Sequence, residues 1–369
     1  MLIVFLTLGL LAVWGTGARA ALQVGGYFET TGQGMFGGGS PSGDDTPSYL
    51  LANHLKLRLD LPDYKDFGAH AEFNAVHLSG AEQPGISDLQ PISIDRLYVT
   101  YNNPAFDLTV GKQRFSWGMG TAFRPVDRFN PPNPVDPSST RAGKNGVELT
   151  VPLGQLSSIS AIAVHDGGGA SGAGVANPWT TGLRARTNVG QTDLAVSVAD
   201  DRVRDARTLG LEAKGDLLVG YHAEAVYEYP GRAFDQGKWT YAVGVDNSWG
   251  ENLFALVEYL HDQSGGDSPE KYRWDLLGTS RQWLGTDYLF GALTYKTDDY
   301  SSLSLSVLRN LKDEGTIITP GFTTEVADGV TLSLKGILVR APEGSEYRPA
   351  GPLPGMREAT VEARLKLAF

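Results

Sequence analysis

The residues best suited to chemistry in this 369-residue chain lie in one stretch of unusual composition. It reads VGKQRFSWG at 110–118 and RPVDRFNPPNPVDP at 124–137. Guanidinium groups present several directed donors, so its arginines are candidates for contact with anionic or carbohydrate solutes. Five residues of this stretch are the candidates for solute contact: Arg114, Trp117, Arg124, Asp127 and Arg128.

Five prolines fall within 14 residues of this stretch, between 124 and 137. Each proline removes a backbone donor and fixes φ, so a regular ladder cannot form there. Long loops without secondary structure usually have a role. The loop at 118–142 is therefore expected to have a role, and one interpretation is a rigid external cap packed around Trp117 and Phe129.

Other charged residues alternate with apolar ones. At 359–369, Val361 and Leu365 share one face of a strand and Arg364 and Lys366 the other, because successive side chains point to opposite faces. A soluble sandwich would turn the apolar face inward. A transmembrane barrel turns it toward lipid and lines its lumen with the polar face.

Strand parity then assigns charged residues to the lumen of a barrel. We expect a basic strip on one wall and an acid-rich wall elsewhere, although each charge could simply pair with a neighbouring strand. The basic residues are Lys56, Arg58, Arg96, Arg184, Arg186, Lys214, Lys335, Arg364 and Lys366. The acidic residues are Glu29, Glu72, Glu148, Glu212, Glu224, Glu228, Glu325 and Glu362.

The elements that position these side chains are strands, mostly of about ten to twelve residues, the length that a tilted strand needs to cross a bilayer. Both faces are fairly apolar at 157–166, 252–262 and 285–296, so sixteen strands is the alternative to eighteen. Short turns alternate with long loops, and an even strand count places both termini on the periplasmic side. The eighteen strands are expected near 21–31, 49–61, 67–78, 92–101, 105–117, 143–153, 157–166, 179–189, 191–200, 206–215, 218–229, 238–248, 252–262, 285–296, 301–311, 316–326, 330–341 and 358–369.

These features predict an all-β fold, an antiparallel up-and-down transmembrane barrel over 21–369. After residue 20 the sequence has no apolar run long enough for a membrane-spanning helix. In lipid, only helices and closed barrels satisfy every backbone polar group. The apolar segment at 2–13 and Ala18-Arg19-Ala20 before Ala21 predict a cleaved signal peptide over 1–20. We expect the mature chain in the outer membrane of a Gram-negative-type cell.

Composition excludes several function classes. The net charge of −11 argues against nucleic-acid binding, which needs a basic face. The absence of cysteine rules out disulfides, thiolate metal sites, a lipoprotein anchor and covalently attached haem. The six histidines lack metal-ligand spacing, and no Ser/His/Asp grouping marks a nucleophile. We therefore predict no catalytic residues, no metal and no cofactor.

Two segments resemble known families. The Gly-Lys-Gln-x-x-x-Trp-Gly run at 111–118, followed by Asn130-Pro131, resembles outer-membrane porin-like and exporter-like barrels. In general porins, the long loop after the fifth strand folds into the lumen and narrows the pore. The resemblance therefore implies that the loop at 118–142 folds inward and constricts a pore, with the five candidates for solute contact, Arg114, Trp117, Arg124, Asp127 and Arg128, at the constriction. The ending at 361–369 resembles the terminal strand that barrel-assembly machinery recognises, which makes Phe369 the expected assembly signal.

The resemblance implies a channel for passive diffusion of small polar or anionic solutes. It also implies contacts with outer-membrane lipids and the assembly machinery, and it leaves open whether the chain forms a homo-oligomer. An exopolysaccharide-export barrel, or a scaffold such as a sheath around a partner cytochrome, is the alternative. A barrel enzyme is the less favoured third class.

Overall fold

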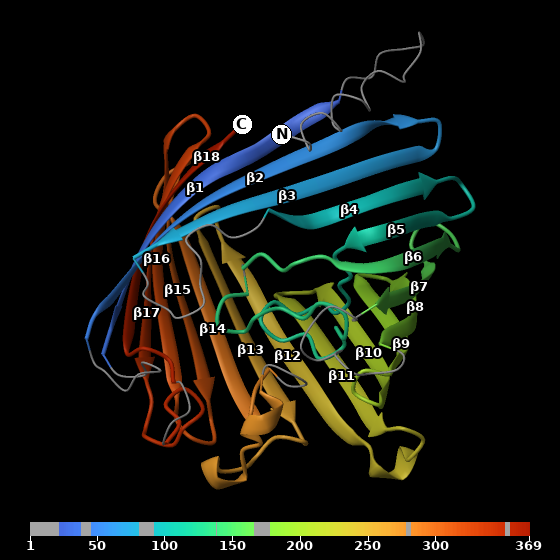
Figure 1. Ribbon diagram of the computed structural model, residues 1–369. Helices are drawn as coiled ribbons and strands as arrows, with labels where there is room; N and C mark the ends of the chain where they lie inside the picture. Colours follow the sequence, from blue (N-terminus) through green and yellow to red (C-terminus); the bar gives the residue numbers. More distant parts are fainter. Residues whose placement is uncertain are drawn as a thin grey trace.

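Eighteen antiparallel strands form one closed sheet in the computed structural model, which describes residues 22–37, 46–80, 92–137, 139–165, 178–277, 282–350 and 355–369. Each strand pairs with the next along the chain, and β18 pairs with β1 (Figure 1). Closure leaves no row of unpaired backbone groups, which a sheet edge would otherwise expose to lipid. The predicted fold class and the eighteen strands are confirmed.

The strands have the following bounds: β1 Gln23–Phe36, β2 Ser48–Tyr64, β3 Phe67–Ser79, β4 Ser93–Asn102, β5 Asp107–Gln113, β6 Lys144–Pro152, β7 Ser158–His165, β8 Trp179–Val189, β9 Thr192–Asp201, β10 Ala206–Asp216, β11 Gly220–Pro230, β12 Lys238–Trp249, β13 Leu253–Asp262, β14 Asp287–Lys296, β15 Ser301–Asn310, β16 Thr316–Ala327, β17 Val330–Arg340 and β18 Ala359–Ala368. Three single-turn 3₁₀ helices lie in the long loops, at Phe234–Gln236, Pro269–Lys271 and Trp274–Leu276.

The fifth and first strands depart from the sequence prediction. β5 ends at Gln113 and not at residue 117, because from Arg114 onward the backbone turns into the barrel and bonds there to side chains. β1 continues to Phe36, beyond the predicted end at 31. The glycine-rich Thr30–Phe36 stretch has low strand propensity, but it is paired with β2 on one side and β18 on the other.

The two faces of the sheet follow the predicted alternation. On β18, Val361 and Leu365 are half exposed on the outer face, whereas Glu362, Arg364 and Lys366 line an internal cavity. The ends of the sheet also meet as predicted, since Phe369 exchanges two backbone hydrogen bonds with Gly26, at 2.9 and 3.1 Å. The predicted signal peptide and its cleavage site lie outside the described residues. Within those residues, no helix is long and apolar enough to cross a membrane.

The loop between β5 and β6 packs against one side of the barrel interior. Its Phe115, Trp117, Val126 and Phe129 form one buried cluster with the wall residues Ile162, Val164 and Val226. Its Ala122 and Phe123 join a second cluster with inward-facing side chains of β13 and β14, Leu256, Leu260, Tyr288 and Phe290 among them. This packing explains why β7, β13 and β14 are apolar on both faces. One face meets lipid and the other meets the loop.

Candidate functional site

The loop at 114–143 crosses the lumen. Near β4, the amide of Gly143 donates to Asp95 Oδ1 at 3.2 Å. Further along the loop, Asp136 is 2.7 Å from Lys335 Nζ on β17. Figure 1 shows the loop as a teal trace inside the barrel, in front of β10–β13. Of the two expected placements, the inward one is therefore observed, and the loop is not an external cap.

Carboxylates of the barrel wall hold the backbone of the loop. Glu258 on β13 is completely buried and accepts hydrogen bonds from three successive amides, those of Thr121, Ala122 and Phe123, at 2.5, 2.7 and 3.1 Å. Its Oε1 is also 2.8 Å from Nε2 of His222. A buried polar group without a partner is costly, so the carboxylate and the irregular backbone satisfy each other.

Glu224 on β11 accepts hydrogen bonds from the loop backbone in the same way. It accepts from the amides of Met119 and Gly120 at 2.5 and 2.8 Å, and from that of Val126 at 3.2 Å. The next carboxylate, Glu212 on β10, accepts from the amide of Gly118 at 3.1 Å. Three wall carboxylates, on β10, β11 and β13, thus accept hydrogen bonds from the loop backbone between residues 118 and 126.

Glu212 and Glu224, which were expected on an acid-rich wall of the lumen, are covered by the loop. Glu212 is buried and bound in bidentate fashion by Arg184, at 2.8 and 2.6 Å. Glu224 is 2% exposed. Arg184, Glu212 and Glu224 therefore face inward. Glu212 and Glu224 contact the loop, and Arg184 contacts Glu212. Glu258 was missed by strand parity, although a lone acid in the apolar run LFALVEYL was a signal for it.

Two of the five predicted constriction residues are buried. Trp117 is 3% exposed and packs edge-on against Phe129, with ring centroids 4.8 Å apart. The carboxylate of Asp127 accepts from the amides of Phe129 and Asn130 at 3.1 and 2.8 Å. Burial raises the pKa of Asp127 above its ordinary range. The structure gives both residues a part in holding the loop, and each is only 3% exposed.

The three arginines of the set reach two different cavities. Arg124 and Arg128 line a cavity of about 410 Å³ at the long-loop end of the barrel, where Arg128 pairs with Glu228. Arg114 lines a larger cavity on the other side of the loop and donates through Nε to the carbonyl of Arg141 at 2.5 Å. The five residues therefore do not converge on one point.

The larger cavity, about 920 Å³, lies between the loop and strands of β1–β4 and β15–β18. It opens among residues near the short-turn end of the barrel, including Phe369 and Gly26. Basic side chains outnumber acidic ones around it, which places the predicted basic strip here. The basic residues are Lys56, Arg58, Arg96, Arg114, Lys335, Arg364 and Lys366, and the acidic ones Glu29, Glu72, Asp136 and Glu362.

These cations differ in how far they are neutralised. Lys56 is buried between Glu72 and Asp95, at 3.1 and 3.0 Å. By contrast, the side chain of Arg58 is more than half exposed, and its partner Asp60, at 3.2 Å, is itself more than a third exposed. Lys366 has its ammonium 4.4 Å from the ring centroid of Tyr27 and no ion pair in the part of the chain that the structure describes. A cation on an aromatic face keeps its charge, so Lys366 and Arg58 are the groups best placed to attract an anion.

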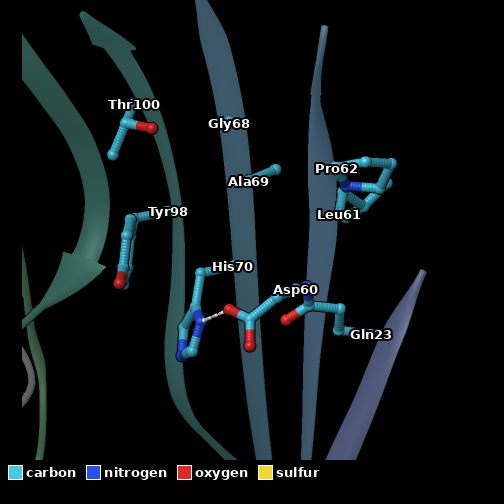
Figure 2. A pocket seen from close by; sticks show the side chains of 9 residues that line it. All are labelled: Gln23, Asp60, Leu61, Pro62, Gly68, Ala69, His70, Tyr98 and Thr100. Atoms are coloured by element: carbon cyan, nitrogen blue, oxygen red, sulfur yellow. Dashed lines mark hydrogen bonds and ion pairs between the residues drawn. The ribbon is translucent and has the colours of Figure 1, made fainter. Parts of the chain in front are cut away.

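The mouth of this lumen carries a smaller pocket of about 330 Å³ on β1–β4 (Figure 2). His70 Nδ1 lies 2.5 Å from Asp60 Oδ1, and the ring stacks on Tyr98 with centroids 4.9 Å apart. The side chains of Gln23 and Thr100 complete the polar lining.

The remaining predicted lumen charges lie apart from the large cavity. Arg186 pairs with Asp193 at 2.5 Å near the short-turn end of β8. Glu148 lies on β6, in register with Ile162 of the next strand. The described residues include no group of three or more His, Asp or Glu side chains with the geometry of a metal site.

Comparison with known proteins identifies a fold. No protein family and no curated protein matches the sequence. Among solved structures, the outer membrane protein opdK from Pseudomonas aeruginosa superimposes with a TM-score of 0.67 at 9% identity, over 96% of this chain and 100% of that one. A BenF-like porin from Pseudomonas fluorescens Pf-5 gives 0.63 at 9% identity, over 96% and 100%. OccAB4 of Acinetobacter baumannii gives 0.60 at 10% identity, over 94% and 97%. At such identities the likeness concerns the barrel architecture alone.

Proposed function

We propose that this chain is an outer-membrane channel through which small polar or anionic solutes diffuse passively. The observation that carries the proposal is the 920 Å³ cavity beside the inward-folded loop, lined mainly by lysine and arginine. A polar lumen inside a shell of outward-facing leucine and valine is the arrangement of a water-filled transmembrane barrel. Excess positive charge in a narrow lumen raises the local concentration of anions.

The loop would act as a fixed constriction. Seven of its backbone amides donate to carboxylates on β10, β11 and β13, those of Glu212, Glu224 and Glu258. Its far part is bonded to β17 through Asp136. Attachment on both sides of the lumen limits its movement, so solutes would pass between the loop and the β1–β4 wall. Solutes that move from the loop toward the short-turn end would meet Arg114 before Arg58 and Lys366.

The same proposal includes the route to the membrane. The leader at 1–20 would direct export and be cleaved near Ala20 and Ala21. Phe369, whose side chain is 59% exposed at the closing strand, would serve in recognition by the barrel-assembly machinery. The outward-facing residues would then contact outer-membrane lipids.

Conductance across a planar bilayer tests the channel. The purified barrel should give discrete conductance steps. Under a salt gradient, its reversal potential should indicate preference for the anion, and this preference should weaken at high ionic strength. A barrel that inserts, shown by its strand-type circular dichroism in vesicles, yet never conducts would overturn the proposal.

A further inference from the structure

A row of four polar side chains crosses the lumen face of the first four strands, at the short-turn end of the barrel. Gln23, Asp60, His70 and Tyr98 are in direct register on β1, β2, β3 and β4 (Figure 2). Residues in register on one face of a sheet lie close enough for their side chains to meet. The row therefore forms one continuous surface, although its members come from four strands.

This row and the next positions toward the mouth enclose the pocket of about 330 Å³. The next inward-facing residue of β3 is Gly68, in register with Thr100 of β4. Because glycine has no side chain, a hollow remains between Thr100 and Pro62 of β2 (Figure 2). Ligand sites range from about 300 to 1,000 Å³, so this pocket suits one small ring and not a chain of rings.

Two polar side chains of the pocket have no hydrogen-bond partner among the residues that the structure describes. They are the amide of Gln23 and the hydroxyl of Thr100. Each of these groups both donates and accepts hydrogen bonds. The pocket thus offers uncommitted donors and acceptors on two of its sides.

The charges around the pocket are compensated. Its one acidic lining residue is Asp60, whose carboxylate lies 3.2 Å from Nε of Arg58 and 2.5 Å from Nδ1 of His70. The other nitrogen of the His70 ring, Nε2, lies 3.3 Å from Glu72. A carboxylate shared in this way carries little free charge into the pocket, so the surroundings favour a neutral ligand over an ion.

Part of the pocket wall is apolar. The His70 ring stacks on the Tyr98 ring, with centroids 4.9 Å apart and planes 23° apart. Leu61 and Pro62 of β2 line the pocket from the other side (Figure 2). Flat rings beside directed hydrogen-bonding groups suit a ligand that has both a C–H surface and hydroxyl groups.

We propose that this pocket binds a neutral monosaccharide at the short-turn mouth of the channel. Every sugar hydroxyl donates and accepts, which matches the amide of Gln23, the hydroxyl of Thr100 and the remaining lone pairs of Asp60. The C–H face of the sugar ring packs against Tyr98. The pocket therefore adds a neutral solute class to the anions that the basic cavity attracts. Its part in transport rests on the proposed channel, whereas binding is measurable without conduction.

Isothermal titration calorimetry of the full barrel tests binding, in a detergent without a sugar headgroup. Glucose, galactose and mannose are the probes, and at least one should bind. Gln23→Ala should weaken binding about threefold to tenfold, the effect of one hydrogen bond. Tyr98→Leu should weaken it at least as much, whereas Tyr98→Phe keeps the ring and should bind as the wild type does. Strand-type circular dichroism confirms that each variant is folded.

Gln191→Ala is the matched control, because Gln191 is exposed in the turn between β8 and β9 at the same end of the barrel. It should bind the sugar with wild-type affinity. Binding of none of the three hexoses would overturn the proposal. Equal weakening by Gln191→Ala and Gln23→Ala would overturn it too, and so would wild-type affinity in both Gln23→Ala and Tyr98→Leu.

Charged analogues test the neutral class. The uronic acid and the amino sugar of the bound hexose should show no loss of affinity in Gln23→Ala. A loss as large as that for the neutral sugar would assign the pocket to ions. Conductance of the same preparations separates the pocket from the channel. A conducting barrel that binds no hexose refutes the pocket alone, and a barrel that binds hexose but never conducts refutes the channel alone.

Discussion

Asp136 and Lys335, 199 positions apart in the sequence, form an ion pair of 2.7 Å that joins the inward-folded loop to β17. The pair lies across the barrel from the carboxylates that hold the loop at β10–β13. It is a second attachment, and it stands in the cavity that the proposed channel uses. The loop is thereby held at two sides of the lumen.

Replacing Lys335 with methionine removes this attachment and keeps most of the side-chain volume. Both partners are about a quarter exposed, so the loss of stability should be small, about 1 kcal/mol or less. The open-channel current should nevertheless become noisier, because the loop moves more freely. Single-channel recordings measure this. Lys271→Met, which removes an exposed outer-loop pair with Asp267, is the control and should leave the noise unchanged.

Glu258→Ala should release the loop more completely. Three backbone amides lose their acceptor in a buried position, a loss of about 3 kcal/mol or more. We expect higher conductance and faster protease cleavage within 118–126. Glu251→Ala, in the exposed turn between β12 and β13, is the matched control. Wild-type conductance in Glu258→Ala, with the barrel folded, would contradict the role assigned to this carboxylate.

Lys366→Glu should reverse or abolish the anion preference. The ammonium of Lys366 faces the cavity 4.4 Å from the centroid of the Tyr27 ring, so the substitution changes the lumen charge by two units. The shift of reversal potential should be largest at low ionic strength. Lys271→Glu makes the same charge change in an exposed outer loop. If both variants shift the potential equally, the lumen position of Lys366 is not what determines selectivity.

Glu346 should make the stability of the outer loops depend on pH. Burial raises its pKa from 4.5 to about 7, although its carboxylate accepts hydrogen bonds from Tyr288 and Asn310. Asp313 lies beside it and accepts from the backbone amide of Glu346 at 2.7 Å. Between pH 4.5 and 7, the carboxyl group of Glu346 is therefore protonated in the folded state and ionised in the unfolded loop. The resulting stability, about 3 kcal/mol, is complete below pH 4.5 and is lost as pH rises through 7.

Hydrogen exchange of residues 341–350 at pH 5 and pH 8, corrected for intrinsic rates, measures this effect. Protection should fall at pH 8 in the wild type. Glu346→Gln keeps an acceptor but cannot ionise, so its protection should be nearly the same at both pH values. A pH-dependent loss of protection that persists in Glu346→Gln would assign the effect to another group.

The alternation of apolar and polar residues along the chain was enough to predict the barrel. A strand alternates its side chains with a period of two, so residues such as Val361 and Arg364 reveal their faces without any tertiary information. Pairing between neighbouring strands then follows chain order, and an even count brings Phe369 beside β1. The strands at 157–166, 252–262 and 285–296 were hard to assign from the sequence because both of their faces are apolar. One face packs against the loop and the other faces lipid.

Only the tertiary structure decided what the loop does. An irregular, proline-rich segment has no periodicity, so the sequence could group Trp117 and Asp127 with the arginines but could not tell which side chains are buried. The bonds that hold the loop to β10, β11, β13 and β17 join residues more than 90 positions apart, as between Gly118 and Glu212 or Phe123 and Glu258. Such contacts depend on barrel closure, which brings distant strands around one lumen. The residues that line a channel and those that support its constriction were therefore separable only in the folded chain.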